Sequence, residues 1–305
     1  MANVRANGVD IEYESVGRED DPVILLIMGF AASLKGWPDS LLHGLAAKGF
    51  RVIRFDNRDA GRSSHLDQLG APDLSAIMAK RRAGEAPRAP YSLDDMAADA
   101  VGLLAALGID RAHIVGASMG GMIAQLVALN HPSRTKSLIS IMSTTGRADL
   151  PAGKPEAFAA ITTPPASPAR EDRIARGIEV WRVIGSPGFP ASDAEIRAYV
   201  ERGVDYAPYD PVGLTRQMAA VLAAPPRNDQ LRTVKAPALV IHGADDPLIP
   251  VAGGEDTAKS IPGAELFVVP GMAHDFRESL GPVYLKAIGD FAAKVEAGRA
   301  QRAAS

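Results

Sequence analysis

The amino-acid sequence predicts an α/β fold with a mostly parallel central sheet that is covered by helices on both faces. Short apolar runs of strand length alternate with segments of helical periodicity, and such alternation requires crossover connections between parallel strands. One of these runs, residues 22–28, is almost continuously apolar, as in a strand buried on both faces of a sheet. The chain has 305 residues, of which 47% are hydrophobic, so it can bury a sizeable core.

The elements are expected in the following order. Residues 2–16 alternate apolar and polar side chains around Asn7-Gly8, which predicts a β-hairpin. The strand at 22–28 is followed by helix 38–48, strand 51–55, helix 92–107, strand 112–116, helix 119–130 and strand 136–142. Ser92 and Asp95 have the spacing of a capping box at the start of one of these helices. The alternation resumes with strand 238–242, helix 251–260, strand 264–269 and a last helix at 279–297.

Residues 147–232 show no convincing strand, but a proline-rich entry and then apolar residues at helical spacing. Open α/β sheets bind ligands at the carboxyl ends of their strands. We therefore interpret 147–232 as a helical cap, or lid, inserted into a core domain formed by residues 1–146 and 233–305. Trp181, Met218 and Leu222 of this cap are candidates for substrate contact, although their helical spacing favours core packing.

Composition excludes several classes of protein. The sequence has no cysteine, which removes disulfides and thiolate metal sites. Its 33 basic and 36 acidic residues are interspersed, so no basic stripe is available for nucleic acid. The first residues lack a secretory signal, and no apolar run is long enough to span a membrane. We expect a soluble, unprocessed cytoplasmic protein without nucleic-acid or membrane partners. The sequence carries no signal for an oligomeric state.

The segment Gly116-Ala-Ser118-Met-Gly120 lies between a predicted strand and a predicted helix. A serine on so tight a turn needs small neighbours, which Gly116, Gly120 and Gly121 provide. Its Oγ would project above the sheet, beside the free N–H groups and positive dipole end of the next helix. Ser118 is therefore the candidate nucleophile.

A serine hydroxyl needs a positioned base, and the base needs a carboxylate that holds its tautomer. His274 lies in a loop directly after a buried strand, where this architecture places a base, so we predict it as the base. Asp245 and Asp246 follow another strand, and we favour Asp246 because Pro247 fixes the backbone after it. The order Ser118, Asp246, His274 is typical of one hydrolase architecture.

The other histidines are expected to be structural or surface residues, except His65, to which the sequence assigns no role. Because they are scattered and lack metal-binding spacing, no metal site is predicted.

A tetrahedral oxyanion needs two hydrogen-bond donors, expected from the residue after the nucleophile and from the loop after the third strand. That loop is residues 28–33. The backbone N–H groups of Met119 and Phe30 are the predicted oxyanion hole, with Gly29 allowing the chain to turn inward and lie beside the substrate.

With these segments together, the sequence resembles the α/β-hydrolase family over nearly its whole length. Met28-Gly29-Phe30, Gly36-Trp37-Pro38-Asp39 and residues 52–63 resemble the branch that contains the aclacinomycin methylesterases and related bacterial carboxylesterases. The resemblance implies a Ser118/Asp246/His274 triad, a helical cap, and hydrolysis of a small to medium, largely apolar carboxylic ester without a cofactor.

Two further features bear on this resemblance. Phe30 replaces a glycine of the methylesterase pattern Met-Gly-Gly and places an aromatic side chain near the mouth of the site, which disfavours a bulky polyketide. Asp56, Arg58 and Gly61 are expected to form a turn and ion-pair network that supports the loop.

Other functions are compatible with the same residues. Enol-lactone hydrolysis, carbon–carbon bond hydrolysis and cofactor-free perhydrolysis all use such a triad. A ligand-binding receptor that keeps the fold without turnover belongs to a different class, which the intact triad sequence disfavours. Because one fold hosts many chemistries, the site must decide among them.

Overall fold

The computed structural model describes the backbone of residues 1–304 and the side chains of residues 1–301. Within these residues, eight strands form one sheet in the order β1-β2-β4-β3-β5-β6-β7-β8. The strands are β1 (Ala2–Ala6), β2 (Val9–Val16), β3 (Val23–Ile27), β4 (Arg51–Phe55), β5 (Ala112–Ala117), β6 (Thr135–Ile141), β7 (Ala238–Gly243) and β8 (Glu265–Val269). The β1–β2 hairpin pairs antiparallel with β4, and all other neighbours are parallel. The predicted α/β fold with a mostly parallel sheet is confirmed.

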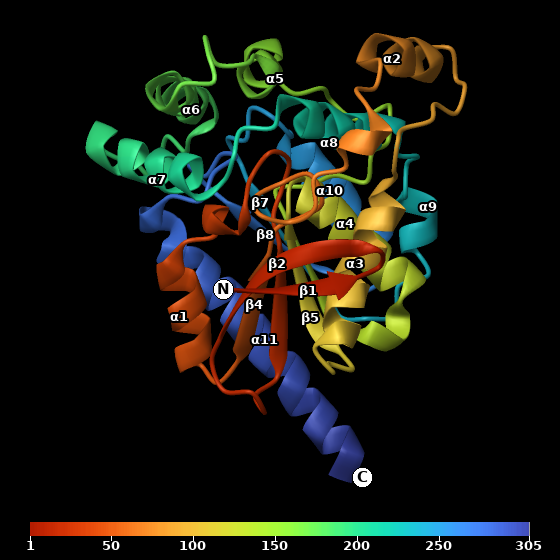
Figure 1. Cartoon of the computed structure of the whole chain (residues 1–305). Coiled ribbons are helices and arrows are strands. Elements are labelled where there is room, and N and C mark those ends of the chain that lie inside the picture. Colours follow the sequence, from red (N-terminus) through yellow and green to blue (C-terminus); the bar gives the residue numbers. More distant parts are fainter. Residues whose placement is uncertain (305) are drawn as a thin grey trace.

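Helices cover both faces of the sheet (Figure 1). On one face, apolar side chains of the strands pack against α3 (Leu93–Ala106) and α4 (Met119–Asn130). On the other they pack against α1 (Asp39–Ala47) and α11 (Gly281–Ala304). The central strands β3 and β5 are buried along their whole length, as expected for a sheet covered on both faces. The capping box of Ser92 and Asp95 is present at the start of α3.

Five helices lie between β6 and β7 along the chain, and no strand interrupts residues 147–232, all of which the structure describes. They are α5 (Pro155–Thr162), α6 (Arg170–Ile184), α7 (Asp193–Tyr206), α8 (Pro211–Ala223) and α9 (Asn228–Leu231). The first four gather at one end of the sheet, whereas α9 lies at its side (Figure 1). That end is the carboxyl end of the parallel strands, because α8 reaches Ala31 just after β3.

Two helices complete the fold together with four short 3-10 segments. The helices are α2 (Leu74–Arg82) and α10 (Val251–Ser260). The 3-10 segments are Leu34–Gly36, Asp67–Leu69, Pro132–Arg134 and Glu278–Leu280. α2 was not predicted from the sequence, because Ile77 is its one buried residue and an apolar repeat is therefore missing. Among the described helices, none has both the length and the apolar character that crossing a membrane requires.

Candidate active site

Ser118 occupies the turn between β5 and α4 in a left-handed backbone conformation, with φ 55° and ψ −121°. Glycines surround this turn because there is no room for a side chain. A Cβ on Gly116 would lie 2.0 Å from the carbonyl oxygen of Gly120, and one on Gly120 would lie 2.1 Å from that of Ile27. The close packing holds the strained serine in place, at the carboxyl end of the sheet.

Three side chains distant in sequence form a hydrogen-bonded row at this turn. His274 Nε2 lies 3.0 Å from Ser118 Oγ, and His274 Nδ1 lies 2.7 Å from Asp246 Oδ2. An ionised carboxylate can only accept, so Nδ1 carries the proton and Nε2 is free to accept the serine O–H. His274 and Asp246 are each 7% exposed. The structure thus brings together the three residues that the sequence singled out, in a geometry suited to deprotonating the hydroxyl.

Asp246 is held by its own loop. Its Oδ1 accepts hydrogen bonds of 2.9 Å from the backbone N–H groups of Leu248 and Ile249. Burial alone would raise the pKa of Asp246, but the charge and hydrogen bonds of His274 and His242 lower it well below its usual range. Asp245 is exposed instead and accepts from the Gly271 N–H. The carboxylate beside His274 is therefore Asp246, and it stays ionised across neutral pH.

The loop that contains His274 is hydrogen-bonded to the end of α6 and to the residues that follow it. The His274 N–H donates to the Ile184 carbonyl at 3.0 Å, and the Ala273 N–H donates to Ser186 Oγ at 2.8 Å. The Ser186 hydroxyl in turn donates to the buried carboxylate of Asp275. These contacts hold the imidazole against a part of the chain nearly ninety residues away. Ser186 was not predicted from the sequence, because an isolated serine in a loop has no distinguishing pattern.

The loop after β3 passes directly beside Ser118. A Cβ on Gly29 would lie 3.1 Å from the Cβ of Ser118, so only glycine allows this approach. The amide of Asn57 fixes the loop by donating to the Met28 carbonyl at 2.9 Å. Among the described residues, the backbone N–H groups of Phe30 and Met119 have no acceptor. Two donors are thus free on the two segments that flank the serine, the arrangement that an oxyanion requires.

Gln217 of α8 fixes the neighbouring N–H of the same loop. Its Oε1 accepts from the Ala31 N–H at 3.1 Å, and its Nε2 donates to the Arg58 carbonyl at 2.8 Å. The side chain is fully buried. Sequence reasoning missed Gln217, although a polar residue beside the apolar positions Leu214 and Met218 marks a buried polar group. Its amide ties α8 to the loop that carries Phe30.

Asp56 supports this loop from below. It accepts from the Leu34 N–H at 2.6 Å and from the hydroxyl of Tyr206 at 2.8 Å. Burial raises its pKa. Gly61 is required opposite it, since a Cβ there would lie 2.0 Å from the Asp56 carboxyl carbon. Arg58 pairs with Asp99 at 2.6 Å. Asp56 thus connects the segment after β3 to Tyr206 at the end of α7 through hydrogen bonds.

A cavity of about 330 Å³ opens above Ser118 and His274, and we call it the serine cavity. Its walls are mostly apolar and include Gly29 and Trp181. Met218 lines the adjoining cavity instead. Leu222 is not among the lining residues of either cavity; it lies one turn further along α8, where its carbonyl accepts from Arg81 at 2.7 Å. Of the three cap residues considered for substrate contact, Trp181 is the one placed beside the serine.

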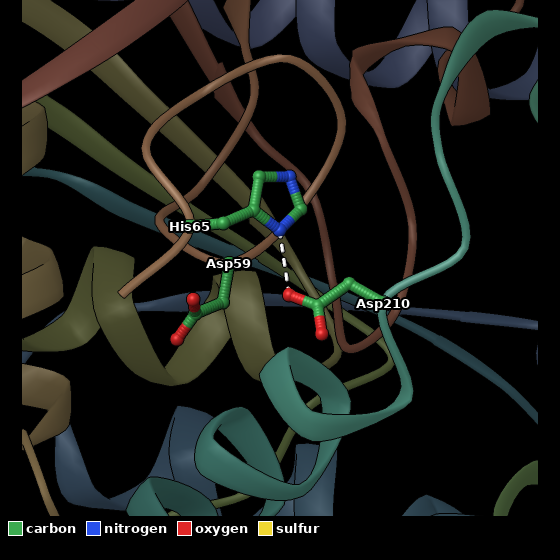
Figure 2. A group of neighbouring side chains, drawn as sticks. All are labelled: Asp59, His65 and Asp210. Atoms are coloured by element: carbon green, nitrogen blue, oxygen red, sulfur yellow. Dashed lines mark hydrogen bonds and ion pairs between the residues drawn. The ribbon is translucent and has the colours of Figure 1, made fainter. Parts of the chain in front are cut away.

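A second polar cluster joins α8 to the core. One ligand atom each of Asp59, His65 and Asp210 lies within 4.8 Å of the others, close enough for a metal site. His65 and Asp210 point toward each other, 2.6 Å apart (Figure 2). However, the Arg216 guanidinium binds both oxygens of Asp59 at 2.8 Å. Because a cation already neutralises the carboxylates, the chemistry of this cluster is that of an ion-pair network rather than a metal site.

The His65–Asp210 pair should make stability depend on pH. Burial alone would lower the pKa of His65, but its hydrogen bond to Asp210 raises it, and the pKa of Asp210 is lowered. The histidine contribution is complete below its ordinary pKa of about 6.5 and is lost as pH rises through the raised value. The aspartate contribution is present above about pH 3.9 and is lost as pH falls through the lowered value.

A double-mutant cycle with His65→Gln and Asp210→Asn tests this pair. We expect a coupling free energy of about 1 kcal/mol at roughly pH 5.5 and almost none at roughly pH 9. Denaturant unfolding of the four proteins measures it. Asparagine at 210 can still accept from the Gly213 N–H, so the cap of α8 is kept. Equal coupling at both pH values would contradict an ionic interaction.

Comparison with known proteins identifies a matching family and related sequences. Residues 22–277 match the family described as having the alpha/beta hydrolase fold. The chain is 32% identical over 286 residues to the rhodomycin D methylesterase DnrP of Streptomyces peucetius, covering 87% of this chain and 89% of that protein.

Solved structures share the fold. An enol-lactonase from Burkholderia xenovorans has a TM-score of 0.70 at 24% identity and covers 96% of this chain and 100% of its own. An esterase from Rhodococcus sp. has a TM-score of 0.73 at 20% identity, covering 96% of this chain and 98% of its own. The topology is thus shared along almost the whole chain.

Proposed function

The chain belongs to the α/β hydrolase fold family, and on this basis we propose that it is a serine carboxylesterase acting through a covalent acyl-enzyme. The proposal assigns Ser118 as nucleophile, His274 as general base and acid, and Asp246 as the residue that orients the imidazole. The methylesterase of Streptomyces peucetius, which is related over most of both chains, supports an ester as substrate.

In the proposed reaction, Ser118 Oγ attacks the ester carbonyl carbon while His274 Nε2 takes the hydroxyl proton. Negative charge forms on the carbonyl oxygen and is stabilised by the N–H groups of Phe30 and Met119. The intermediate collapses, the bond to the alcohol oxygen breaks, and His274 returns the proton to the leaving alcohol. Water then attacks the acyl carbon and gives its proton to the same imidazole; the bond to Ser118 Oγ breaks, His274 returns the proton to Ser118, and the acid is released.

The observation that carries the proposal is the hydrogen-bonded row of Ser118, His274 and Asp246 at the floor of an apolar cavity. The mostly apolar walls favour esters of small to medium size with largely apolar groups. Residues 147–232, which we propose to act as a cap, cover this cavity with Trp181 and Ile184 of α6.

A panel of p-nitrophenyl esters tests the proposal by pre-steady-state kinetics. We expect turnover of short acyl chains, with a burst of about one equivalent of p-nitrophenol per enzyme if deacylation is slower than acylation. A fluorophosphonate should label Ser118, which mass spectrometry of the labelled peptide identifies. A lactone or dienoate preferred by orders of magnitude would contradict ester hydrolysis. Failure of the fluorophosphonate to react would contradict a serine nucleophile and favour a binding protein.

A further inference from the structure

A second cavity of about 490 Å³, which we call the distal cavity, adjoins the serine cavity. Leu74, Leu214 and Met218 line it. Both cavities share Phe30 on the core side and Gly177 on the α6 side. A substrate bound at Ser118 can therefore extend between the loop after β3 and α6 into the distal cavity.

One face of α6 runs along both cavities. Arg173, Gly177 and Trp181 lie at successive spacings of four residues, so they share one side of the helix. Trp181 lines the serine cavity, and Arg173 lines the distal cavity. At a rise of about 1.5 Å per residue, the two positions are about 12 Å apart along the helix axis. Gly177, between them, lines both cavities, and a Cβ there would lie 2.4 Å from the Val200 side chain, so the glycine lets α7 pack closely against α6.

Arg173 is a cation without a carboxylate partner among the residues whose side chains are described. Its Nη2 donates to the Ala207 carbonyl at 3.1 Å, and its guanidinium carbon lies 5.5 Å from the centre of the Tyr209 ring. Burial lowers its pKa. The next arginine on the same helix differs, since Arg176 pairs with Glu179 at 2.8 Å. Arg173 therefore has hydrogen-bond donors left for a ligand.

Three acidic side chains near Arg173 already pair with other basic groups. The pairs are Asp205 with Arg170 at 2.7 Å, Asp210 with His65 at 2.6 Å and Asp59 with Arg216 at 2.8 Å. The wall of the distal cavity thus has the Arg173 guanidinium without a carboxylate partner, together with Arg176, Tyr209 and three threonines among otherwise apolar residues. Such a combination suits an apolar chain that ends in an anion.

We propose that Arg173 binds a carboxylate at the far end of the acyl chain, so that the preferred substrates are half-esters of apolar dicarboxylic acids. The inference rests on the ester hydrolysis proposed above and names its substrate class. The guanidinium presents paired N–H groups that match a carboxylate in geometry. The distance along α6 requires a chain long enough to span both cavities, so short dicarboxylates should gain little from Arg173.

Binding to the Ser118→Ala variant tests the proposal independently of turnover. Isothermal titration calorimetry compares monomethyl azelate with its neutral analogue, dimethyl azelate. We expect the half-ester to bind roughly tenfold more tightly, and Arg173→Gln in the same background to bring the ratio of the two dissociation constants near one. Arg173→Lys should keep part of the preference, because it keeps the charge. Monomethyl succinate should show no preference over dimethyl succinate.

Arg182→Gln is the matched control, because Arg182 lies on the same helix, is exposed and pairs with Asp193. It should leave the ratio unchanged. Equal affinity for half-ester and diester, or a preference that survives in Arg173→Gln, would overturn the proposal. Hydrolysis of both esters by the protein with Ser118 is measured in parallel. Absence of hydrolysis with preferential binding intact would contradict the proposed function alone, so the two failures are distinguishable.

Discussion

Replacing Ser118 with alanine is expected to lower kcat for ester hydrolysis by about 10⁶-fold. The change removes the oxygen that forms the acyl bond, and no neighbouring hydroxyl lies in the row with His274. The remaining groups act as a unit, so the residual rate should come from binding and from the two free N–H groups alone. Steady-state kinetics on a p-nitrophenyl ester measures the loss.

The matched control is Ser40→Ala, which removes an exposed hydroxyl on α1 and should leave kcat unchanged. Ser118→Ala should also retain its melting temperature, because among the described residues the Ser118 hydroxyl has a hydrogen bond with His274 alone. Retained hydrolysis in this variant would rule out an acyl-enzyme on Ser118. A parallel drop in melting temperature would show that the hydroxyl also supports the turn.

Replacing Asp246 with asparagine should lower kcat by about 10⁴-fold. The asparagine amide can donate to His274 Nδ1, which favours the tautomer with the proton on Nε2, and that nitrogen can then no longer accept from Ser118. The substitution also removes the negative charge that stabilises the imidazolium. The size of the loss in kcat/KM for the same ester measures both effects together.

Asp245→Asn provides the comparison, because Asp245 is adjacent in the chain but exposed and hydrogen-bonded to the Gly271 N–H. We expect its kcat to remain within about twofold of the unaltered protein. Equal losses from the two asparagine variants would mean that the loop as a whole matters rather than the carboxylate beside His274.

Much of the fold was predictable from local patterns. The apolar runs of β3 and β5 and the apolar periodicity of α3 depend on burial against the sheet, which a sequence window records directly. Ser118 was recognisable because a strand, a tight glycine-rich turn and a helix follow one another within a few residues. The choice of Asp246 over Asp245 rested on Pro247, and in the structure Asp246 is the one beside His274. The catalytic roles of these residues stay predictions.

The rest depended on contacts between distant segments. Gln217 fixes Ala31 across 186 residues, and Ser186 fixes the His274 loop from the end of α6. Whether Arg173 has a partner likewise depends on how the helices of residues 147–232 pack together. Helical periodicity predicted a buried face on α8 but did not separate Met218, which reaches a cavity, from Leu222, which does not. The spacing of apolar residues predicts which side chains are buried, but it does not predict which segments they pack against.

Because of the glycines beneath Ser118, amino-acid substitutions should be tolerated less well beneath the serine than on the opposite side of the serine cavity. On the floor, any larger side chain at Gly116 or Gly120 would collide with the backbone of α4 or β3, so the reacting centre tolerates no redesign there. The opposite walls of the serine and distal cavities include side chains of α5–α8, which are not part of the sheet. Changes in substrate preference should therefore arise from substitutions in α5–α8 rather than beneath Ser118. A directed-evolution library confined to α6 and α8 should yield altered acyl selectivity at little loss of folded protein.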